Sequence, residues 1–164
     1  MKILVFSDSH GSRELMKRIV KKHKDIGVII FCGDGHSDIE NIQCDFPNKK
    51  YYCVKGNCDW NCNFPTMLTV TLANKKILVT HGHVHGVKQG LSRLIALGHN
   101  ENADIVFYGH THRRVTTADS RMLVMNPGAL CENGEYGIVD IDEETGIITA
   151  SEYPDNRFGN VVIR

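Results

Sequence analysis

The sequence lacks a net charge, a long apolar run and a cleavable leader. Its 164 residues include 19 Lys+Arg and 19 Asp+Glu, so the formal net charge at pH 7 is zero. A broad basic face for nucleic acid is therefore not expected. The longest apolar run, residues 26–32, is too short to cross a bilayer. The N-terminal segment has neither the apolar region nor the cleavage site of a signal peptide, so we expect a cytoplasmic protein without a membrane partner.

Cysteine is present, but not in the spacing of a zinc knuckle or a redox pair. The sequence has six cysteines, and three residues separate Cys58 from Cys62 where a C-x-x-C motif has two. Cys32 and Cys53 lie in apolar, strand-like runs, which favours small buried side chains. Without a leader, six cysteines in such a chain indicate reduced thiols. The histidines are the better indication of a site.

The length and an apolar content of 41% fit one compact domain over residues 1–164. In the first two-thirds, apolar runs alternate with polar Gly-containing turns and helical patterns, which predicts βα units. Ser12 is a candidate N-cap for the first helix, Ser37 begins a capping-box pattern, and Gly98 is a candidate C-terminal stop. From Val115 onward, short alternating strands predict a β meander without helices.

Polar clusters follow the predicted strands of the βα region, at the point where each strand ends. Seven of the nine histidines lie in these strand-end segments, while His23 and His99 lie near helix ends. Ligands of open α/β sheets bind at the carboxyl ends of strands, so we expect the clusters to converge. The candidate residues are Asp8, His10, Asp34, His36, Asn57, His81, His83, His85, His110 and His112.

Imidazoles, carboxylates and one amide, with no thiolate among them, suit Mn, Fe, Co, Ni or Zn rather than Ca or Mg. His110 and His112 are two residues apart and point to one side of an extended segment, so one strand end could serve two neighbouring ions. Two ions about 3.5–4 Å apart need a shared ligand. Asp34, in a tight Gly-Asp-Gly turn, is the best candidate for that bridge.

Taken together, these segments resemble the signature of the calcineurin-like metallophosphoesterases. The similar segments occur in order between Met1 and about Gly128, and five together are far more specific than any one alone. They are Asp8-x-His10, Gly33-Asp34, Gly56-Asn57-x-Asp59, His81-Gly82-His83 and Gly109-His110-Thr111-His112. The small size, the Gly-Asn-Cys-Asp form of the third segment and Asn126-Pro127-Gly128 are similar to the small prokaryotic YfcE-like phosphodiesterases. The resemblance implies an α/β fold, a four-layer α/β/β/α sandwich.

The resemblance also implies a dinuclear metal centre, with Mn as the first expectation and Ni, Zn, Fe or Co as alternatives. One metal would be held by Asp8, His10, Asp34 and His112, and the other by Asp34, Asn57, His81 and His110. The implied reaction is hydrolysis of a small phosphoester, most of all a phosphodiester, by in-line attack of a hydroxide that bridges the ions. Asp34, Asn57 and His83 are the predicted catalytic residues. Small members of this family often form dimers, so a homodimer is one expectation.

Cys58 is a departure from the wider family, in which a histidine follows the asparagine and assists the leaving group. A thiol is not a charged donor at neutral pH. Either another residue protonates the leaving group, with His83 or His36 as candidates, or the enzyme prefers good leaving groups. We expect Cys58 to be a small packing residue, while the role of Asp59 stays open.

Two other functions compete with hydrolysis of small phosphoesters. A non-catalytic metal-binding scaffold, as in the retromer subunit with this fold, is disfavoured because all seven ligand positions hold competent residues. A small nuclease is disfavoured because the chain is too short for a capping domain and has no excess of basic residues to follow a phosphate backbone.

Overall fold

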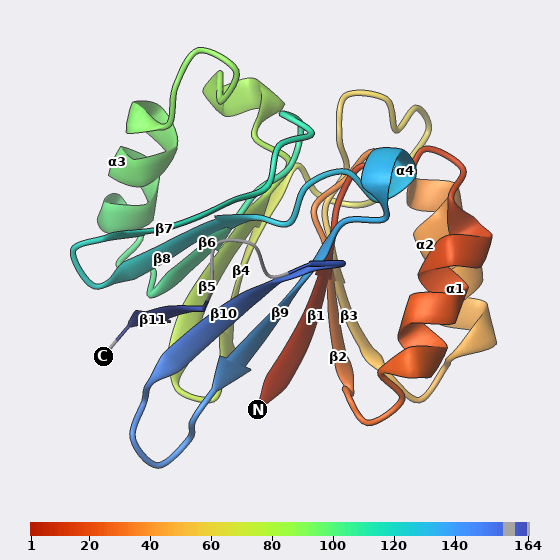
Figure 1. Cartoon of the computed structure of the whole chain (residues 1–164). Helices are drawn as coiled ribbons and strands as arrows, with labels where there is room; N and C mark the ends of the chain where they lie inside the picture. The colour runs from red at the N-terminus through yellow and green to blue at the C-terminus, as the bar shows by residue number, and fades with distance from the viewer. Residues whose placement is uncertain (156–159, 164) are drawn as a thin grey trace.

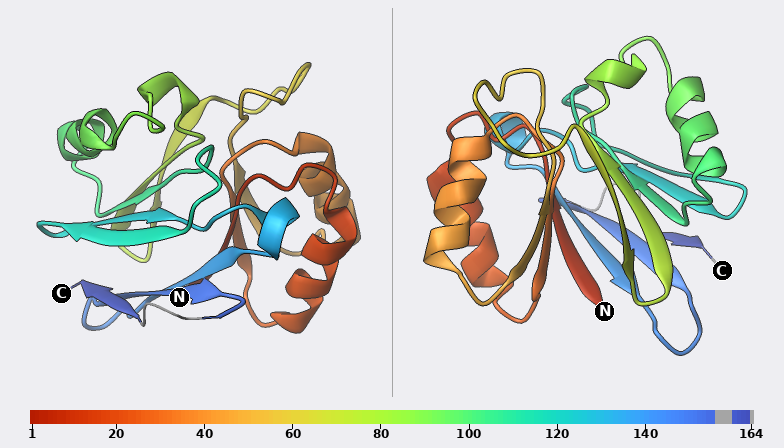
Figure 2. Two further views of the ribbon diagram at one scale, coloured as in Figure 1. Left: turned by 45° about the horizontal axis from the view of Figure 1, so that its top comes forward. Right: turned by 180° about the vertical axis from the view of Figure 1, so that it is seen from behind.

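The computed structural model describes residues 1–155 and 160–163, and it contains two β-sheets with helices on their outer faces (Figure 1). The strand orders are β11-β10-β9-β1-β2-β3 in sheet A and β4-β5-β6-β8-β7 in sheet B. In both views of Figure 2, α1 and α2 lie on one side of the pair of sheets and α3 lies on the other. The predicted four-layer α/β/β/α sandwich is therefore confirmed. The expected domain of residues 1–164 includes positions 156–159 and 164, which lie outside the described residues.

Sheet A combines parallel strands from the start of the chain with antiparallel strands from its end. β1 pairs with β2 in parallel and with β9 in antiparallel orientation. Every residue of β2 is buried, as expected for a strand covered on both faces. The strands are β1 (Lys2–Phe6), β2 (Val28–Phe31), β3 (Lys50–Cys53), β9 (Tyr136–Ile141), β10 (Ile148–Tyr153) and β11 (Val161–Ile163).

Sheet B is built around the parallel strands β5, β6 and β8. β4 and β5 form a hairpin, which turns through Ala73 and Asn74, both with positive φ, as two-residue hairpin turns require. The strands are β4 (Met67–Leu72), β5 (Lys75–Thr80), β6 (Ile105–Phe107), β7 (Val115–Asp119) and β8 (Met122–Asn126).

The apolar core has three parts, one between the sheets and one under each helical layer. Side chains of β1, β2, β5 and β6 fill the space between the sheets. α1 (Arg13–Lys22) and α2 (His36–Asp45) pack on sheet A through Met16 and Ile39, and α3 (Ser92–Asn100) packs on sheet B through Leu94. Two shorter elements are the 3-10 turn η1 (His83–His85) and α4 (Leu130–Asn133). None of the described helices is long and apolar enough to cross a membrane.

The prediction for the last third of the chain is wrong in part. The β7–β8 hairpin belongs to sheet B, whereas β9, β10 and β11 belong to sheet A, so the segment does not form one meander. Helix α4 lies between the two groups, where no helix was expected. An alternating pattern tells which face of a strand is buried but not which sheet the strand joins, and this explains the error.

The predicted helix boundaries also need correction. Ser12 precedes α1 but makes no side-chain capping bond. α2 begins at His36, with Gly35 at the N-cap, so Ser37 lies inside the helix rather than capping it. Gly98 lies within α3 and is buried against sheet B; a Cβ there would come within 2.5 Å of Met122 Sδ. Gly98 therefore serves close packing rather than ending the helix.

Candidate metal centre

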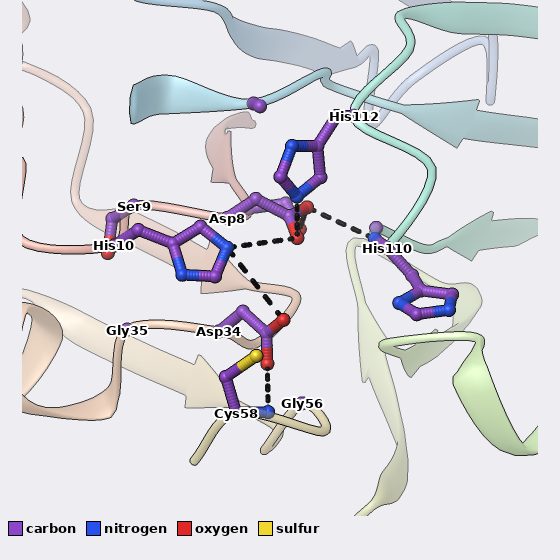
Figure 3. A network of polar contacts seen from close by, with 12 residues as sticks. Asp8, Ser9, His10, Asp34, Gly35, Gly56, Cys58, His110 and His112 are labelled. Atoms are coloured by element: carbon purple, nitrogen blue, oxygen red, sulfur yellow. Dashed lines mark hydrogen bonds and ion pairs between the residues drawn. The ribbon is translucent and has the colours of Figure 1, made fainter. Parts of the chain in front are cut away.

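The loops that follow the carboxyl ends of β1 and β2 in sheet A and of β5 and β6 in sheet B meet at one place. Most of the predicted site residues lie there (Figure 3). Sheet A contributes Asp8 and His10 after β1 and Asp34 after β2, as the sequence predicted. Sheet B contributes its residues from the loops that follow β5 and β6. Residues from widely separated parts of the chain thus converge at the junction of the two sheets.

The first group of possible metal ligands is Asp8, His10 and His112, which each offer a donor atom within 4.8 Å of the others. His112 Nε2 lies 3.2 Å from Asp8 Oδ1, and His10 Nε2 lies 4.0 Å from the same oxygen (Figure 3). His112 and His10 thus approach the same buried carboxylate.

The second group is Asp34, His81 and His110. Asp34 Oδ2 lies 3.3 Å from His81 Nε2 and 3.8 Å from His10 Nε2, so this carboxylate faces a histidine of each group. A third group joins His10 and Asp34 with the thiol of Cys58. Asp34 is thus the carboxylate that lies between a histidine of each group.

Two polar atoms of fully buried side chains at this place have no hydrogen-bond partner among the described residues. They are Asp8 Oδ1 and His81 Nε2, and both side chains are fully buried. An unpaired buried polar group costs about 1–3 kcal/mol, and more when it is charged. A divalent cation bound by each group would satisfy these atoms, and nitrogen with carboxylate oxygen is a suitable donor set for a transition metal. The residues therefore fit the metal centre that the sequence predicted.

The two carboxylates differ in their electrostatic environment. Burial raises the pKa of Asp8, and the neighbouring His81 and Ser7 only partly offset this effect. Burial acts in the same direction on Asp34, but the contacts with His81 and with the backbone N–H of Cys58 outweigh it and bring the pKa of Asp34 below its usual range. Asp34 is thus held as a carboxylate over a wider pH range than Asp8.

The histidines of the second group also differ. Burial alone would lower the pKa of His81, but Asp34 and Asp8 outweigh it and raise the value. Burial, with the charges of His81 and Lys88, lowers the pKa of His110 to about 4. His110 is therefore neutral near pH 7, the form in which imidazole binds a metal.

Two of the histidines are oriented through their second ring nitrogen. His81 Nδ1 donates to the carbonyl oxygen of Cys32 at 2.7 Å, and His112 Nδ1 donates to Glu132 Oε1 at 2.6 Å. Bonds of this kind are usual for metal-binding histidines, because they fix the ring and leave Nε2 as the ligand atom. Sequence reasoning missed Glu132, which lies in the unexpected helix α4 and in none of the motifs.

The structure gives Asp59 a definite role. Its carboxylate accepts hydrogen bonds from the backbone N–H groups of Asp34, Gly35, His36 and Gly56, at 2.8–2.9 Å. Burial opposes ionisation, but these four bonds outweigh it and lower the pKa of Asp59. Asp59 therefore ties the loop that carries Asp34 to the loop that follows β3.

Asn57, the remaining predicted ligand, lies next to Cys58 in the loop that follows β3. It is exposed, and its one side-chain hydrogen bond within the described part of the chain goes to Cys58 Sγ, at 3.2 Å. Cys58 is exposed as well, so the expectation of a packing residue is wrong. Partial desolvation and the adjacent Asp34 raise the pKa of the Cys58 thiol, which is therefore protonated near neutral pH.

His83, the third predicted catalytic residue, lies beside the second group. Its ring centroid is 5.4 Å from that of His81 and 6.1 Å from that of His110. Burial, with the charge of His81, lowers its pKa. His36, the other candidate proton donor, is directed toward Asp59, with Nδ1 3.2 Å from Oδ1. His83 is therefore the better placed of the two.

The backbone at the centre adopts unusual conformations. Five of the predicted ligands have positive φ: Asp8 (52°), His10 (39°), Asp34 (61°), His110 (68°) and His112 (56°). Non-glycine residues rarely occupy this region, and each such residue costs about 1–3 kcal/mol. Conformations of this kind cluster at functional sites, where the surrounding structure holds them.

The comparisons with known proteins agree with this geometry. A family model described as the calcineurin-like phosphoesterase superfamily domain matches residues 1–144. The probable metallophosphoesterase YsnB of Bacillus subtilis is 36% identical over 131 residues, which cover 79% of this chain and 75% of YsnB. The phosphodiesterase MJ0936 of Methanocaldococcus jannaschii is 30% identical over 147 residues, covering 80% of this chain and 85% of that protein.

A solved structure supports the fold. A protein from Streptococcus pneumoniae, described as a predicted phosphoesterase, superposes with a TM-score of 0.81 at 24% identity, and the match covers 99% of this chain and 96% of that chain. The extent of the family match, with these relatives, shows that the chain belongs to the calcineurin-like phosphoesterase superfamily, a family of metal-dependent phosphoester hydrolases.

Proposed function

We propose that this protein hydrolyses small phosphodiesters at a centre that binds two divalent metal ions. The observation that carries the proposal is the position of Asp34, whose Oδ2 faces His10 of one ligand group and His81 of the other. The phosphodiesterase name of the relative MJ0936 supports a diester as the substrate class. We propose Mn as the metal, with Ni, Zn, Fe and Co as alternatives that the same donor atoms suit.

Two divalent ions would supply positive charge for the phosphoryl oxygens and a water of lowered pKa for in-line attack on phosphorus. In the first group, Asp8, His10 and His112 would hold one ion with Asp34. In the second, His81 and His110 would hold the other, again with Asp34. We propose Asn57 as a further ligand of the second ion, which requires its side chain to turn away from Cys58 Sγ.

We propose that His83 contacts the leaving oxygen of the substrate. It lies beside His81 and His110, and its lowered pKa keeps the imidazole largely neutral at pH 7. A neutral imidazole is a weak proton donor, because the charged form carries the transferable proton. This arrangement supports the second of the two sequence-based alternatives, a preference for esters with good leaving groups.

Replacement of Asp34 tests the proposal. We expect Asp34→Asn to abolish Mn- or Ni-dependent hydrolysis of bis(p-nitrophenyl) phosphate and to reduce the number of ions bound per chain, because the amide offers one oxygen in place of two. Asp25→Asn, at an exposed aspartate after α1, is the matched control and should keep full activity. Circular dichroism checks that both variants are folded. If Asp34→Asn retained most of the activity, the bridging role of Asp34 would be wrong.

The same preparation separates the competing functions. Stoichiometric metal binding without turnover of phosphomonoesters, phosphodiesters or cyclic nucleotides would favour the non-catalytic scaffold. Binding to DNA with a steep salt dependence would favour the nuclease. We also propose a cytoplasmic location, which the six free thiols support, because disulfides are rare in that compartment.

A further inference from the structure

A pocket of about 380 Å³ lies between the segment that follows η1 and the loop between β6 and β7. Its walls include the apolar side chains of Val87, Tyr108 and Val115. Val87 and Tyr108 are themselves buried, at 4% and 1% exposure, so these walls are firmly packed. The volume lies within the usual range for small-molecule sites and is sufficient for a single ring.

The pocket adjoins the candidate metal centre. Two of its lining residues, Tyr108 and Thr111, stand on either side of His110 in the chain. The loop between them is fixed by Asn126, whose side-chain amide donates to Gly109 O at 2.9 Å and to Thr111 Oγ1 at 3.0 Å. The same short loop therefore forms one wall of the pocket and carries a proposed metal ligand.

Two cations, Lys88 and Arg113, also line the pocket, and both are exposed. Within the described residues, neither has a carboxylate at ion-pair distance. The neighbouring Arg114, in contrast, pairs with Glu135 at 2.9 Å. The positive charge of Lys88 acts on His110, so it lies close enough to the centre to influence a ligand there. The pocket thus combines an apolar wall with two cations that have no carboxylate partner in the described part of the chain.

We propose that this pocket binds the organic group of the substrate beyond the reacting phosphate, and that it selects a group with an apolar body and a second anionic end. Leu91 and Val115, the half-buried apolar residues of the lining, would contact the apolar body, while Lys88 and Arg113 would bind the anion. The inference rests on the proposed phosphodiesterase function and adds its substrate class.

The test uses two phosphodiesters that differ only in the second anion, benzyl p-nitrophenyl phosphate and 4-carboxybenzyl p-nitrophenyl phosphate, with the Mn-loaded protein. We expect the carboxylated ester to have a kcat/KM about fivefold to tenfold higher, mainly through KM, as befits two accessible ion pairs. The double variant Lys88→Gln/Arg113→Gln should remove this preference, so that the two esters have the same kcat/KM. The control Arg18→Gln/Lys21→Gln removes the same charge from exposed positions on α1 and should keep the preference.

A binding measurement separates the two proposals. We expect 4-carboxybenzylphosphonate, added to the metal-free protein, to shift the amide NMR signals of Thr111 and Val115, and to lose this effect in the Lys88→Gln/Arg113→Gln variant. If these shifts occurred but neither ester were hydrolysed, the proposed phosphodiesterase function would be wrong, and the proposed binding of an anionic organic group in the pocket would stand. If both esters were hydrolysed equally, or if the preference remained in the double variant, the proposed role of the pocket would be wrong. The proposed phosphodiesterase function would stand.

Discussion

At the scale of single residues, Asp59 shows how one carboxylate stabilises the loops of the centre. We expect Asp59→Asn to lower the free energy of unfolding by about 2–4 kcal/mol, because the amide nitrogen would face backbone N–H donors that now bind a carboxylate oxygen. Denaturant unfolding measures the change. Asp142→Asn, at an exposed aspartate that also accepts backbone bonds, is the control and should change stability far less.

The same variant has a defined pH dependence. The pKa of Asp59 in the folded protein lies below the unfolded value of about 3.9. Its contribution to stability is therefore complete above that unfolded value and is lost as the pH falls through the folded pKa. The stability difference between the protein and Asp59→Asn should be constant near neutral pH and should shrink in acid. A difference independent of pH down to full protonation would contradict this account.

The candidate ligands could be predicted from the sequence because they lie in short motifs. The residues to which they form hydrogen bonds could not. Asp8, His10, Asp34, His81, His110 and His112 could be named because each follows a strand-like run. The bond from His112 to Glu132 could not be predicted, because it depends on a short helix with no sequence signal. The left-handed backbone of the ligands was equally hidden, since none of them is glycine.

At the scale of elements, helix propensity and core packing have opposite effects on the stability of a Gly98→Ala variant in α3. Helix propensity alone predicts that Gly98→Ala would stabilise the protein by about 1 kcal/mol. Packing predicts the opposite, because the new Cβ would lie 2.5 Å from Met122 Sδ and 2.9 Å from Val106 Cγ2. Both partners are buried, and an overpacked core usually loses about 1–3 kcal/mol. We therefore expect a net loss of stability with unchanged metal affinity, measured by thermal unfolding and metal titration. A gain in stability would show that the sheet gives way to the added methyl group.

The strands of the βα region could be predicted with their order along the chain, because runs buried on both faces are distinctive. The β7–β8 hairpin and β9 could not be assigned to a sheet, although their alternation was visible. β8 pairs with β6 and β9 pairs with β1, and these pairings join residues far apart in the chain. Local sequence patterns do not indicate which strands pair.

At the scale of the whole molecule, the centre links the two sheets. The three candidate ligands Asp8, His10 and Asp34 follow strands of sheet A. The other three, His81, His110 and His112, follow strands of sheet B. We expect Mn²⁺ to raise the thermal unfolding temperature, since a ligand at 100 times its Kd adds about 2.7 kcal/mol to stability. His81→Ala should lose this effect, and His99→Gln, at an exposed histidine away from the centre, should retain it. If the unfolding temperature were the same with and without Mn²⁺, this would argue against a metal bound between the sheets.

The four-layer architecture was predictable only through resemblance to a known family, because periodicity alone indicated βα units and a separate meander. What periodicity could not supply was the pairing of the two sheets face to face through a shared core of side chains such as Ile3, Ile30, Ile77 and Phe107.

At the five predicted ligands with positive φ, the residue that suits the backbone and the residue that suits the chemistry differ. Glycine at any of these positions would relax the backbone, and it would also remove a side chain that is predicted to bind metal. Selection for thermostability alone would therefore erode the centre one residue at a time, with the fold improving as the activity disappeared. At these five positions the protein accepts a stability–activity trade-off, and only a requirement for the chemistry opposes that drift.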